Sequence, residues 1–411
     1  MTDAATVLAR CAELDEFSAR PDGLERVYLS PEHARANGRV ADWMRQAGLR
    51  TWQDAAGNQC GRHEGRTPGL PALLVGSHLD TVPDAGSYDG MLGVLMAVAV
   101  AERLRDRVRE LPIALEVIGF GDEEGTRFGT TLLGSRAVAG RWDESWWDLR
   151  DRDGLTLRHA FLEFGLDPAR VADATRAPDE LVGYLEAHIE QGPHLEAAGR
   201  ALGYVTTIAG ARRFSLTVVG EARHAGGTPY PRRRDALVGA SEAIVAIEQT
   251  ARAAGCLATV GRIEVAPGAV NVVPGRVDFS LDLRAITDTH RDATWDAVRG
   301  RIDGICSARG LRFEAHELHR AAATPCAAWL QEAVVSGIAA TGDAEPPGLW
   351  SPAGHDAMAL GQTTDVGMLF IRCADGISHH PAEAVDEVDV AQGLDALESA
   401  VLAVATRWAR R

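Results

Sequence analysis

Short apolar runs alternate with a helical pattern in the first half of the chain, and this alternation constrains the fold most. Residues 71–77 and 113–120 are apolar runs typical of buried strands, and residues 90–107 between them have the spacing of a helix. Strands that alternate with helices form a largely parallel sheet with helices on its faces. The sequence therefore predicts an α/β fold here.

A different order of elements begins near residue 211. Strands are expected at residues 213–219, 258–265, 276–284 and 311–316, with helices at 234–253 and 289–308. This β-α-β-β-α-β order is that of a ferredoxin-like domain, in which two helices cover one face of a four-stranded sheet.

Beyond Pro325 the α/β pattern resumes, with a helix to Thr341, a strand at 366–372 and a closing helix at 388–411. A chain of 411 residues is long enough for two hydrophobic cores. We therefore expect a discontinuous first domain, residues 1–210 and 322–411, interrupted by an inserted second domain, residues 211–321.

Charge and composition exclude several classes of protein. The formal net charge of -16 argues against a nucleic-acid partner, because such proteins need a basic surface to replace counterions. The longest apolar run, near residues 94–101, is too short to span a bilayer, and the N-terminus lacks a signal pattern, so the cytoplasm is expected. The six cysteines form no CxxC pair and are expected to be reduced thiols.

Polar residues follow both predicted strands directly. His78 and Asp80 follow the first strand, and Asp122, Glu123 and Glu124 follow the second. Ligands of α/β sheets bind beyond the carboxyl ends of strands, so chemistry is expected here. His78 can bind a metal while the Asp80 carboxylate accepts its second ring N–H, although a polar turn explains the pair as well.

Three adjacent carboxylates repel one another unless a cation neutralises them or one is protonated. A solvated surface loop is one explanation of Asp122, Glu123 and Glu124. The alternative divides the work: one glutamate binds a metal, and its neighbour exchanges protons with a water.

Three further positions each allow two interpretations. Asp89, before the apolar helix, suits a helix cap or a bridge between cations. His188 suits the core or a metal, and His379 and His380 are adjacent in a loop. Nitrogen and oxygen ligands without thiolates favour a divalent ion and make a structural zinc knuckle a poor explanation.

Nine motifs occur in one order along the chain: GSHLDTV, YDG, GDEEGTRF, EAHIEQGP, GEARHAGGTP, NVVPG, DLR, AGHDA and GISHHPAE. Together they resemble the hydantoinase/carbamoylase branch of the M20 metallopeptidase-like amidohydrolases, which includes N-carbamoyl-L-amino-acid hydrolases and allantoate amidohydrolases. The match covers nearly the whole chain. It implies a di-metal aminopeptidase-like catalytic domain and an inserted ferredoxin-like lid that also forms a homodimer.

The resemblance also implies the metal site. Two divalent ions (Zn²⁺, Mn²⁺, Co²⁺ or Ni²⁺) are expected, with Asp89 bridging them. The implied ligands are His78, Asp89 and His188 for one ion, and Asp89, Glu124 and His379 for the other. His379 is preferred to His380 because it occupies the histidine of the SHxP pattern. Glu123 corresponds to the general base and Asp80 to the carboxylate behind the ligands.

Substrate-binding positions follow from the same resemblance: Gln191, His224, Asn271, Arg284, Gly354 and His355. The family presents His224 and Asn271 to the neighbouring subunit's site, where His224 would stabilise the developing oxyanion. The chain departs from the family at Arg223, where a glycine commonly precedes that histidine.

The expected activity is hydrolysis of a linear amide or ureido C–N bond, foremost in an N-carbamoyl-L-amino acid, giving the amino acid, CO2 and ammonia. Allantoate is the alternative substrate, and a peptidase or aminoacylase fits the motif forms less well. A non-catalytic ligand-binding protein of this fold would be expected to lack a ligand or the base, and the sequence retains both.

Overall fold

The computed structural model describes residues 2–410, which form two compact units. The first comprises residues up to 206 and from 325, and the second comprises residues 207–324. The predicted insertion, 211–321, begins one residue inside β7, which starts at Gly210, and ends with the last residue of β13, Ala321.

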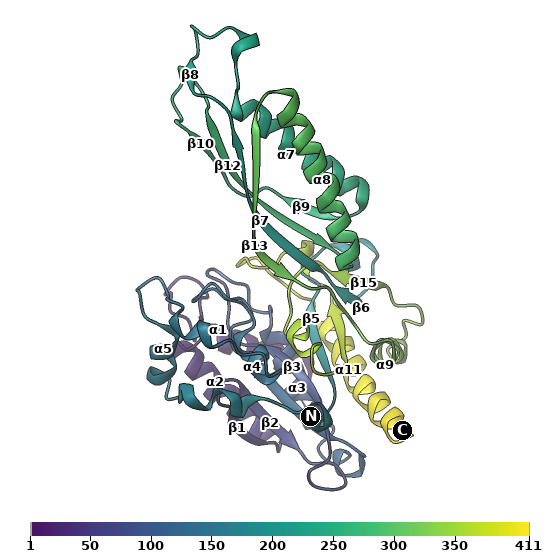
Figure 1. The fold of residues 1–411 in the computed structure, drawn as a ribbon. Helices are drawn as coiled ribbons and strands as arrows, with labels where there is room; N and C mark the ends of the chain where they lie inside the picture. The colour runs from purple at the N-terminus through teal and green to yellow at the C-terminus, as the bar shows by residue number, and fades with distance from the viewer. Residues whose placement is uncertain (1, 411) are drawn as a thin grey trace. The chain divides into compact units, whose positions relative to one another are not determined.

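The first unit is built on a nine-stranded sheet with the order β1-β2-β4-β3-β5-β16-β6-β14, and β15 pairs with β6 (Figure 1). Strands β4, β3, β5 and β16 are parallel, while β2 and β6 pair antiparallel on either side of them. The predicted mixed α/β fold is confirmed. The strands are β1 (Arg50–Gln53), β2 (Gln59–His63), β3 (Ala72–His78), β4 (Ala114–Phe120), β5 (Leu181–Ile189), β6 (Leu202–Ile208), β14 (Thr324–Pro325), β15 (Gly348–Ser351) and β16 (Val366–Ile371).

Helices of the first unit share one apolar core with β3, β5 and β16. The core contains side chains of the long helices α1, α2, α3, α9 and α11. The helices of this unit are α1 (Ala4–Asp15), α2 (Pro31–Gln46), α3 (Met91–Arg103), α4 (Leu133–Val138), α5 (Leu157–Glu163), α6 (His194–Ala197), α9 (Ala328–Ala340), α10 (Ala357–Leu360) and α11 (Glu387–Trp408).

Helix α3 approaches β5 closely because of one glycine. Residues 91–101 of this helix are all buried. A Cβ atom at Gly93 would lie 2.0 Å from the carbonyl oxygen of Ala187, so no larger residue fits at this spacing. The start of α3, next to Asp89, is thereby held beside the strand that carries His188.

The parallel strands end at a common edge of the sheet. His78, the last residue of β3, is in register with Phe120, the last residue of β4. On the other side, His188 of β5 is in register with Phe370 of β16. The polar residues that follow these strands in sequence therefore gather at one edge.

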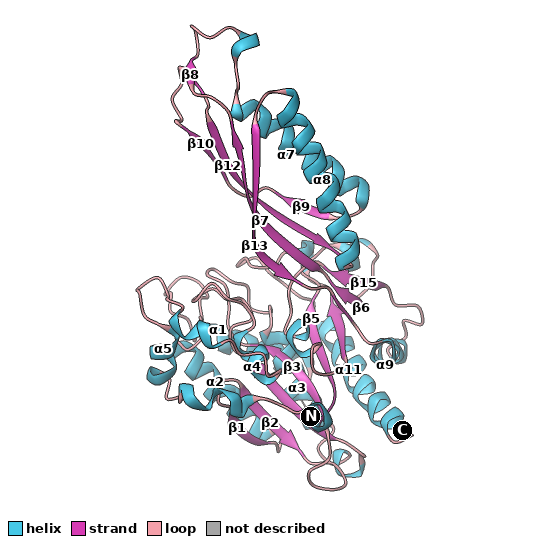
Figure 2. Ribbon diagram, in the orientation of Figure 1, coloured by secondary structure: helices cyan, strands magenta, loops and turns pink. Residues whose placement is uncertain are grey.

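The second unit has a separate antiparallel sheet with the order β10-β12-β7-β13, and β9 also pairs with β12. Helices α7 and α8 lie together on one face of this sheet (Figure 2), over an apolar core of their own. The second strand expected from the sequence is divided into β9 and β10. The elements are β7 (Gly210–Val219), β8 (Arg223–His224), α7 (Ala236–Ala254), β9 (Leu257–Thr259), β10 (Ile263–Ala266), β11 (Val272–Val273), β12 (Arg276–Ala285), α8 (Asp288–Ala308) and β13 (Arg312–Ala321).

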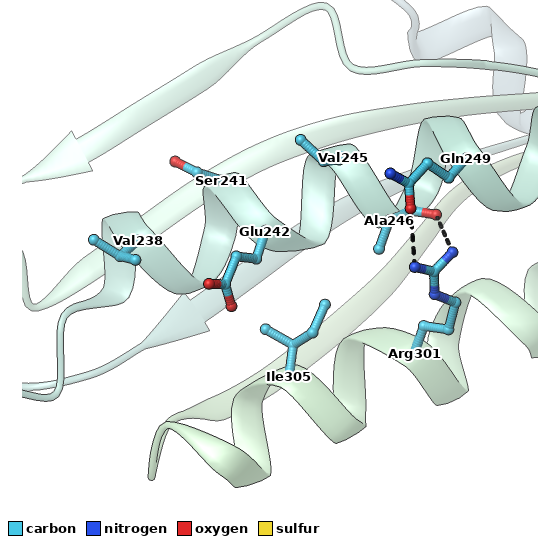
Figure 3. Close-up of a pocket in the computed structure, with 8 residues that line it drawn as sticks. All are labelled: Val238, Ser241, Glu242, Val245, Ala246, Gln249, Arg301 and Ile305. Carbon is cyan, nitrogen blue, oxygen red and sulfur yellow. Dashed lines mark hydrogen bonds between the residues drawn. The ribbon is translucent and has the colours of Figure 1, made fainter.

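A shallow groove lies between α7 and α8 on the outside of the second unit (Figure 3). Arg301 crosses it and donates hydrogen bonds to the side-chain oxygen of Gln249 and the carbonyl oxygen of Ala246. Its lining residues are Val238, Ser241, Glu242, Val245, Ala246, Gln249, Arg301 and Ile305. None of them is a predicted site residue.

Two further expectations concern the whole chain. Among residues 2–410, no helix is both long enough and apolar enough to cross a membrane. The six cysteines are all buried free thiols.

A buried histidine, His33 of α2, makes the fold sensitive to acid. Its ring is fully buried, accepts a hydrogen bond from the Leu29 N–H at 3.2 Å and stacks on Phe164 with ring centres 5.3 Å apart. Burial lowers the pKa of His33 to about 4. The folded protein therefore keeps this ring neutral where the unfolded chain protonates it.

We predict that His33→Asn removes part of the acid instability. Between the ordinary histidine pKa of 6.5 and the folded value of about 4, the unfolded state gains a proton that the folded state does not. The free energy of unfolding of the wild type therefore falls through this window, by about 3 kcal/mol at its lower end. Asparagine keeps an acceptor for Leu29 but does not titrate. Urea unfolding at a series of pH values measures the slope, and equal slopes for both proteins would contradict the assignment.

Candidate metal centre

Asp89 is the centre of a cluster of histidines at the sheet edge. Its Oδ1 atom lies 3.1 Å from Nε2 of His188 and 3.4 Å from Nε2 of His78. Its Oδ2 atom lies 3.2 Å from Nε2 of His379. The helix-cap interpretation is wrong, because Gly90 is the N-cap of α3 and no side chain caps it.

The tautomers of two histidines follow from their backbone contacts. Nδ1 of His78 lies 3.0 Å from the Asp80 carbonyl oxygen, and Nδ1 of His188 lies 2.9 Å from the Ile189 carbonyl oxygen. A carbonyl oxygen only accepts, so each Nδ1 carries the hydrogen. In neutral rings both Nε2 atoms are acceptors close to the same Asp89 oxygen, so either a proton on each Nε2 or a metal cation must lie between them.

The spacing of these atoms suits a metal. Two ligand atoms bonded at about 2.0–2.1 Å to a tetrahedral ion are separated by about 3.3 Å. The distances from Asp89 Oδ1 to the two Nε2 atoms, 3.1 and 3.4 Å, bracket this value. His78, Asp89 and His188 therefore can hold a divalent ion with little movement.

A second cluster shares Asp89 with the first. Nε2 of His379 lies 3.4 Å from Oε1 of Glu124, and these two residues and Asp89 place their ligand atoms within 4.8 Å of one another. His379 has a left-handed backbone conformation, with φ of 55°. His380 is different, because its Nδ1 accepts a hydrogen bond from the Ala382 N–H within its own turn.

The acidic residues are buried rather than solvated. Glu123 is 9% exposed, and the side chain of Glu124 is also 9% exposed. Burial raises the pKa of Glu123 to about 7. Burial and the neighbouring carboxylates of Glu123 and Asp89 raise the pKa of Glu124 well above its usual value. A bound cation would relieve this cost, so the donor set fits divalent metal.

The Asp80 carboxylate has a different principal contact from the one the sequence predicts. Its oxygens accept hydrogen bonds from the backbone N–H groups of Glu123, at 3.0 Å, and Glu124, at 3.2 Å. It lies 3.6 Å from Nδ1 of His78, which instead contacts the Asp80 backbone carbonyl. The side chain therefore supports the glutamates and also lies close to the His78 ring, whose Nδ1 donates to the main-chain carbonyl.

Glu123, Gly354 and His355 lie beside these clusters. A Cβ atom at Gly354 would stand 3.4 Å from Oε1 of Glu123. His355 is 1% exposed, its Nε2 lies 2.7 Å from Oγ of Ser351, and its ring meets the His188 ring edge to face at 4.6 Å. His355 therefore packs behind a metal-ligand candidate.

Glu186, His188 and His355 also place ligand atoms close together. The Glu186 oxygens, however, accept hydrogen bonds from the Ser77 hydroxyl at 2.8 Å and the Ala357 N–H at 3.1 Å. Both Glu186 oxygens are thus held by protein donors, as Asp89 Oδ2 is. Because Glu186 and His355 are not among the five ligands that the family resemblance implies, we expect this group to support His188.

Gln191 points at Asp89 in this structure. Its amide nitrogen donates to Asp89 Oδ2 at 2.7 Å and to Ser378 Oγ at 3.2 Å. Its backbone is left-handed, with φ of 54°. Non-glycine residues in this conformation are strained and often mark functional sites.

Three predicted substrate residues belong to the second unit. His224 and Asn271 are neighbours, because β8 pairs with β11 and the Ala225 N–H donates to the Asn271 carbonyl oxygen at 2.9 Å. Arg284 lies near the C-terminal end of β12, whereas Asn271 precedes the N-terminal end of this strand. The Asp282 carboxylate accepts hydrogen bonds from Arg284 Nε at 2.8 Å and from its Nη2 at 3.1 Å.

A model of the peptidase family M20/M25/M40 matches residues 74–403, which is most of the chain. The chain belongs to this family. The M20 match includes every residue of the two metal clusters and confirms the family resemblance seen in the motifs.

Individual members of the M20 family are similar to this chain over most of its length. The chain is 41% identical over 392 residues to an N-carbamoyl-L-amino acid amidohydrolase of Geobacillus stearothermophilus, covering 94% of this chain and 95% of that protein. It is also 41% identical over 423 residues to an allantoate deiminase of Arabidopsis thaliana, covering 95% and 81%. An amidase of the hydantoinase/carbamoylase family from Burkholderia multivorans has a similar crystal structure, with a TM-score of 0.90, 31% identity and 98% coverage of both chains.

Sequence reasoning missed several residues that surround the clusters. Glu186, Ser351, Ser378 and Glu383 all contact a cluster residue or a residue that supports one. Three of them stand inside quoted motifs, Glu186 in EAHIEQGP and Ser378 and Glu383 in GISHHPAE, and these motifs were the available signal. Their contacts could not be read from the motifs, because their partners are distant in sequence.

We predict that divalent ions stabilise the wild type and that Asp89→Asn removes most of this effect. An ion that binds only the folded state at about 1,000 times its Kd adds about 4 kcal/mol to the free energy of unfolding. Asparagine lacks the charge and cannot bridge two clusters. Thermal unfolding with and without Zn²⁺ or Co²⁺ measures the shift in Tm. Asp143→Asn, at an exposed acid in a distant turn, serves as control; an undiminished shift in Asp89→Asn would exclude this site.

Proposed function

We propose that this chain is a metal-dependent hydrolase of linear amide and ureido C–N bonds, and that its main substrate is an N-carbamoyl-L-amino acid. The products would be the amino acid, CO2 and ammonia. The observation that carries the proposal is the pair of ligand clusters that share Asp89 beside the buried carboxyl group of Glu123. The name of the Geobacillus relative, an N-carbamoyl-L-amino acid amidohydrolase, supports the substrate class.

Two divalent ions are proposed per chain. His78, Asp89 and His188 would hold one, and Asp89, Glu124 and His379 the other, in agreement with the two clusters. Zn²⁺, Mn²⁺, Co²⁺ and Ni²⁺ all suit these ligands. When bound, such ions lower the pKa of a water from about 15.7 toward 7 and polarise a substrate carbonyl.

Glu123 is proposed as the general base and acid. It is not one of the five proposed ligands, although its carboxylate lies close enough to the ligand atoms of His78 and Glu124 to form a further group with them, and the Asp80 carboxylate fixes its backbone. Burial brings the pKa of Glu123 to about 7, and a group with this pKa both accepts and returns a proton at neutral pH. Glu123 would take the proton of the attacking water and deliver it to the departing nitrogen.

Arg284 is proposed to bind the substrate carboxylate, because a guanidinium pairs with carboxylates through parallel hydrogen bonds. Asp282 holds one side of this guanidinium and fixes its plane. Gln191 and Gly354 would line the rest of the substrate site, with Gln191 giving up part of its contact with Asp89, and the buried His355 would support it from behind His188.

A homodimer is proposed because one second unit cannot bring His224 and Arg284 together. Strand β12 pairs with β7 from Arg276 to Ala285; Arg276 follows β11 by three residues, whereas Arg284 lies at the opposite end of β12. Extended strand from Arg276 to Arg284 covers about 26 Å, several times the reach of a small ureido acid. His224 and Asn271 would therefore act on a partner chain's substrate, with His224 stabilising the oxyanion.

The two units would divide the work. We propose the first, discontinuous unit as a di-metal aminopeptidase-like catalytic domain and the second as a ferredoxin-like lid and dimerisation domain. The strand order β10-β12-β7-β13 with two helices on one face supports the ferredoxin-like assignment.

Allantoate is the second candidate substrate, because the allantoate deiminase of Arabidopsis thaliana is as similar to this chain as the carbamoylase is. Both substrates offer a ureido group and a carboxylate to the same donors. A peptidase activity is less well supported. Parallel assays with N-carbamoyl-L-amino acids, allantoate and dipeptides, following ammonia or amino-acid release with each metal, test the proposal; turnover of dipeptides alone would overturn it.

We predict that Glu123→Gln keeps metal binding but loses turnover. The amide has nearly the same shape and cannot accept the water proton, so kcat should fall by about 10²–10⁴-fold with little change in KM. Metal content after dialysis and steady-state kinetics on the best substrate measure the two effects. Near-normal kcat would remove Glu123 from the role, and loss of metal would make it a ligand instead.

A further inference from the structure

Glu383 is a buried carboxyl group that holds the backbone around Asp89. It is 6% exposed and follows the loop that carries His379. Its Oε1 atom accepts hydrogen bonds from the backbone N–H of Tyr88, at 2.8 Å, and from the backbone N–H of Asp89, at 3.1 Å. The C-terminal loop is thereby tied to the loop before α3.

Ser378 connects the two carboxyl groups. Its Oγ atom lies 2.7 Å from Asp89 Oδ2 and 3.1 Å from Glu383 Oε2. A hydroxyl has one hydrogen to donate, and the shorter contact is the one to Asp89. The Gln191 amide donates to both Asp89 Oδ2 and Ser378 Oγ. Asp89 Oδ2 thus receives two donors, which sets the rotation of its carboxylate.

The loop before Asp89 is shaped to admit Glu383. A Cβ atom at Gly86 would lie 2.3 Å from the Cβ atom of Glu383 and 2.4 Å from its carboxyl carbon. A glycine is therefore required at this contact. Burying one carboxyl group against another does not favour folding, so general stability does not explain the arrangement.

We propose that Glu383 and Ser378 are positioning residues that hold the Asp89 carboxylate in the orientation needed to bridge two metal ions. Glu383 fixes the Asp89 main chain, and Ser378 fixes the side chain. Both come from the loop that supplies His379, so the same contacts set the separation of His379 and Asp89. The inference rests on the proposed function of Asp89 as the shared metal ligand.

The test compares Glu383→Ala with Glu383→Gln. Glutamine keeps an oxygen for the two N–H groups, and its amide can donate to Ser378, whose hydrogen remains available to Asp89. Alanine removes all of these contacts. Co²⁺ alone is titrated into metal-free protein, and its absorption spectrum reports affinity and ligand geometry. Because residues behind metal ligands typically contribute 10–100-fold in affinity, Glu383→Ala should lose about that much, with an altered spectrum, and Glu383→Gln should remain close to wild type.

Asp151→Ala is the matched control. The Asp151 side chain is 7% exposed and also accepts from two backbone N–H groups, those of Asp153 and Leu155, without touching a cluster residue. It should leave Co²⁺ affinity unchanged even where it lowers the Tm. Equal Co²⁺ affinity in Glu383→Ala and wild type, or no rescue by glutamine, would overturn the proposal.

Ser378→Ala removes a single hydroxyl and decides the question if Glu383→Ala does not fold. It should weaken Co²⁺ binding and change the spectrum while the Tm of the metal-free protein stays near that of wild type; unchanged Co²⁺ binding would overturn the proposal. These measurements need no substrate. A wild type that binds Co²⁺ but hydrolyses no ureido acid would refute the proposed function alone, whereas loss of Co²⁺ specific to these variants would still support the positioning role.

Discussion

The convergence of three imidazole rings on one carboxylate is the constraint on which the rest of the structure depends. His78, His188 and His379 approach Asp89 from three separate segments of the first unit. Each segment must end at the right place, which the parallel register of β3, β5 and β16 ensures. Gly93 then lets α3 approach the sheet and brings Asp89 into reach. The packing of the apolar helix α3 therefore determines where the charged Asp89 carboxylate lies.

Local sequence patterns predict the strands and helices, because the residues of these elements follow a regular spacing along the chain. Apolar runs predict β3 and β4 to within a residue or two, and the helical spacing predicts α3. The ligand set came from the order of motifs, since each residue alone had an ordinary structural explanation. Long-range contacts have no such signature: nothing near Asp80 indicates that its carboxylate accepts from Glu123, or that Glu383 reaches Asp89. The division of one predicted strand into β9 and β10 was missed for a similar reason, because edge pairing with β12 determines it.

The two units differ in the side chains that they bury. The first keeps acidic and imidazole groups out of water and supplies many of them with backbone donors or hydroxyls, such as Ser77 and Ser351, although the carboxylate oxygens of Asp122 have no hydrogen-bond partner among residues 2–410. The second is an antiparallel sheet whose apolar core needs no such support. Its polar residues of interest, His224 and Arg284, belong to different strand pairs, β8–β11 and β12–β7. The substrate-binding roles proposed for His224 and Arg284 therefore fall at separate positions of this unit.

The place of β16 in the sheet has a consequence for protein synthesis. This strand lies between β5 and β6, although it is translated more than 150 residues after them. Domains on the ribosome fold from the N-terminus onward, at about 5–20 residues per second. A growing chain therefore holds β5 and β6 without the strand that joins them until residue 371 has emerged, and His379 follows later still. The group of Asp89, Glu124 and His379 therefore cannot assemble until late in translation, because His379 is made long after its two partners.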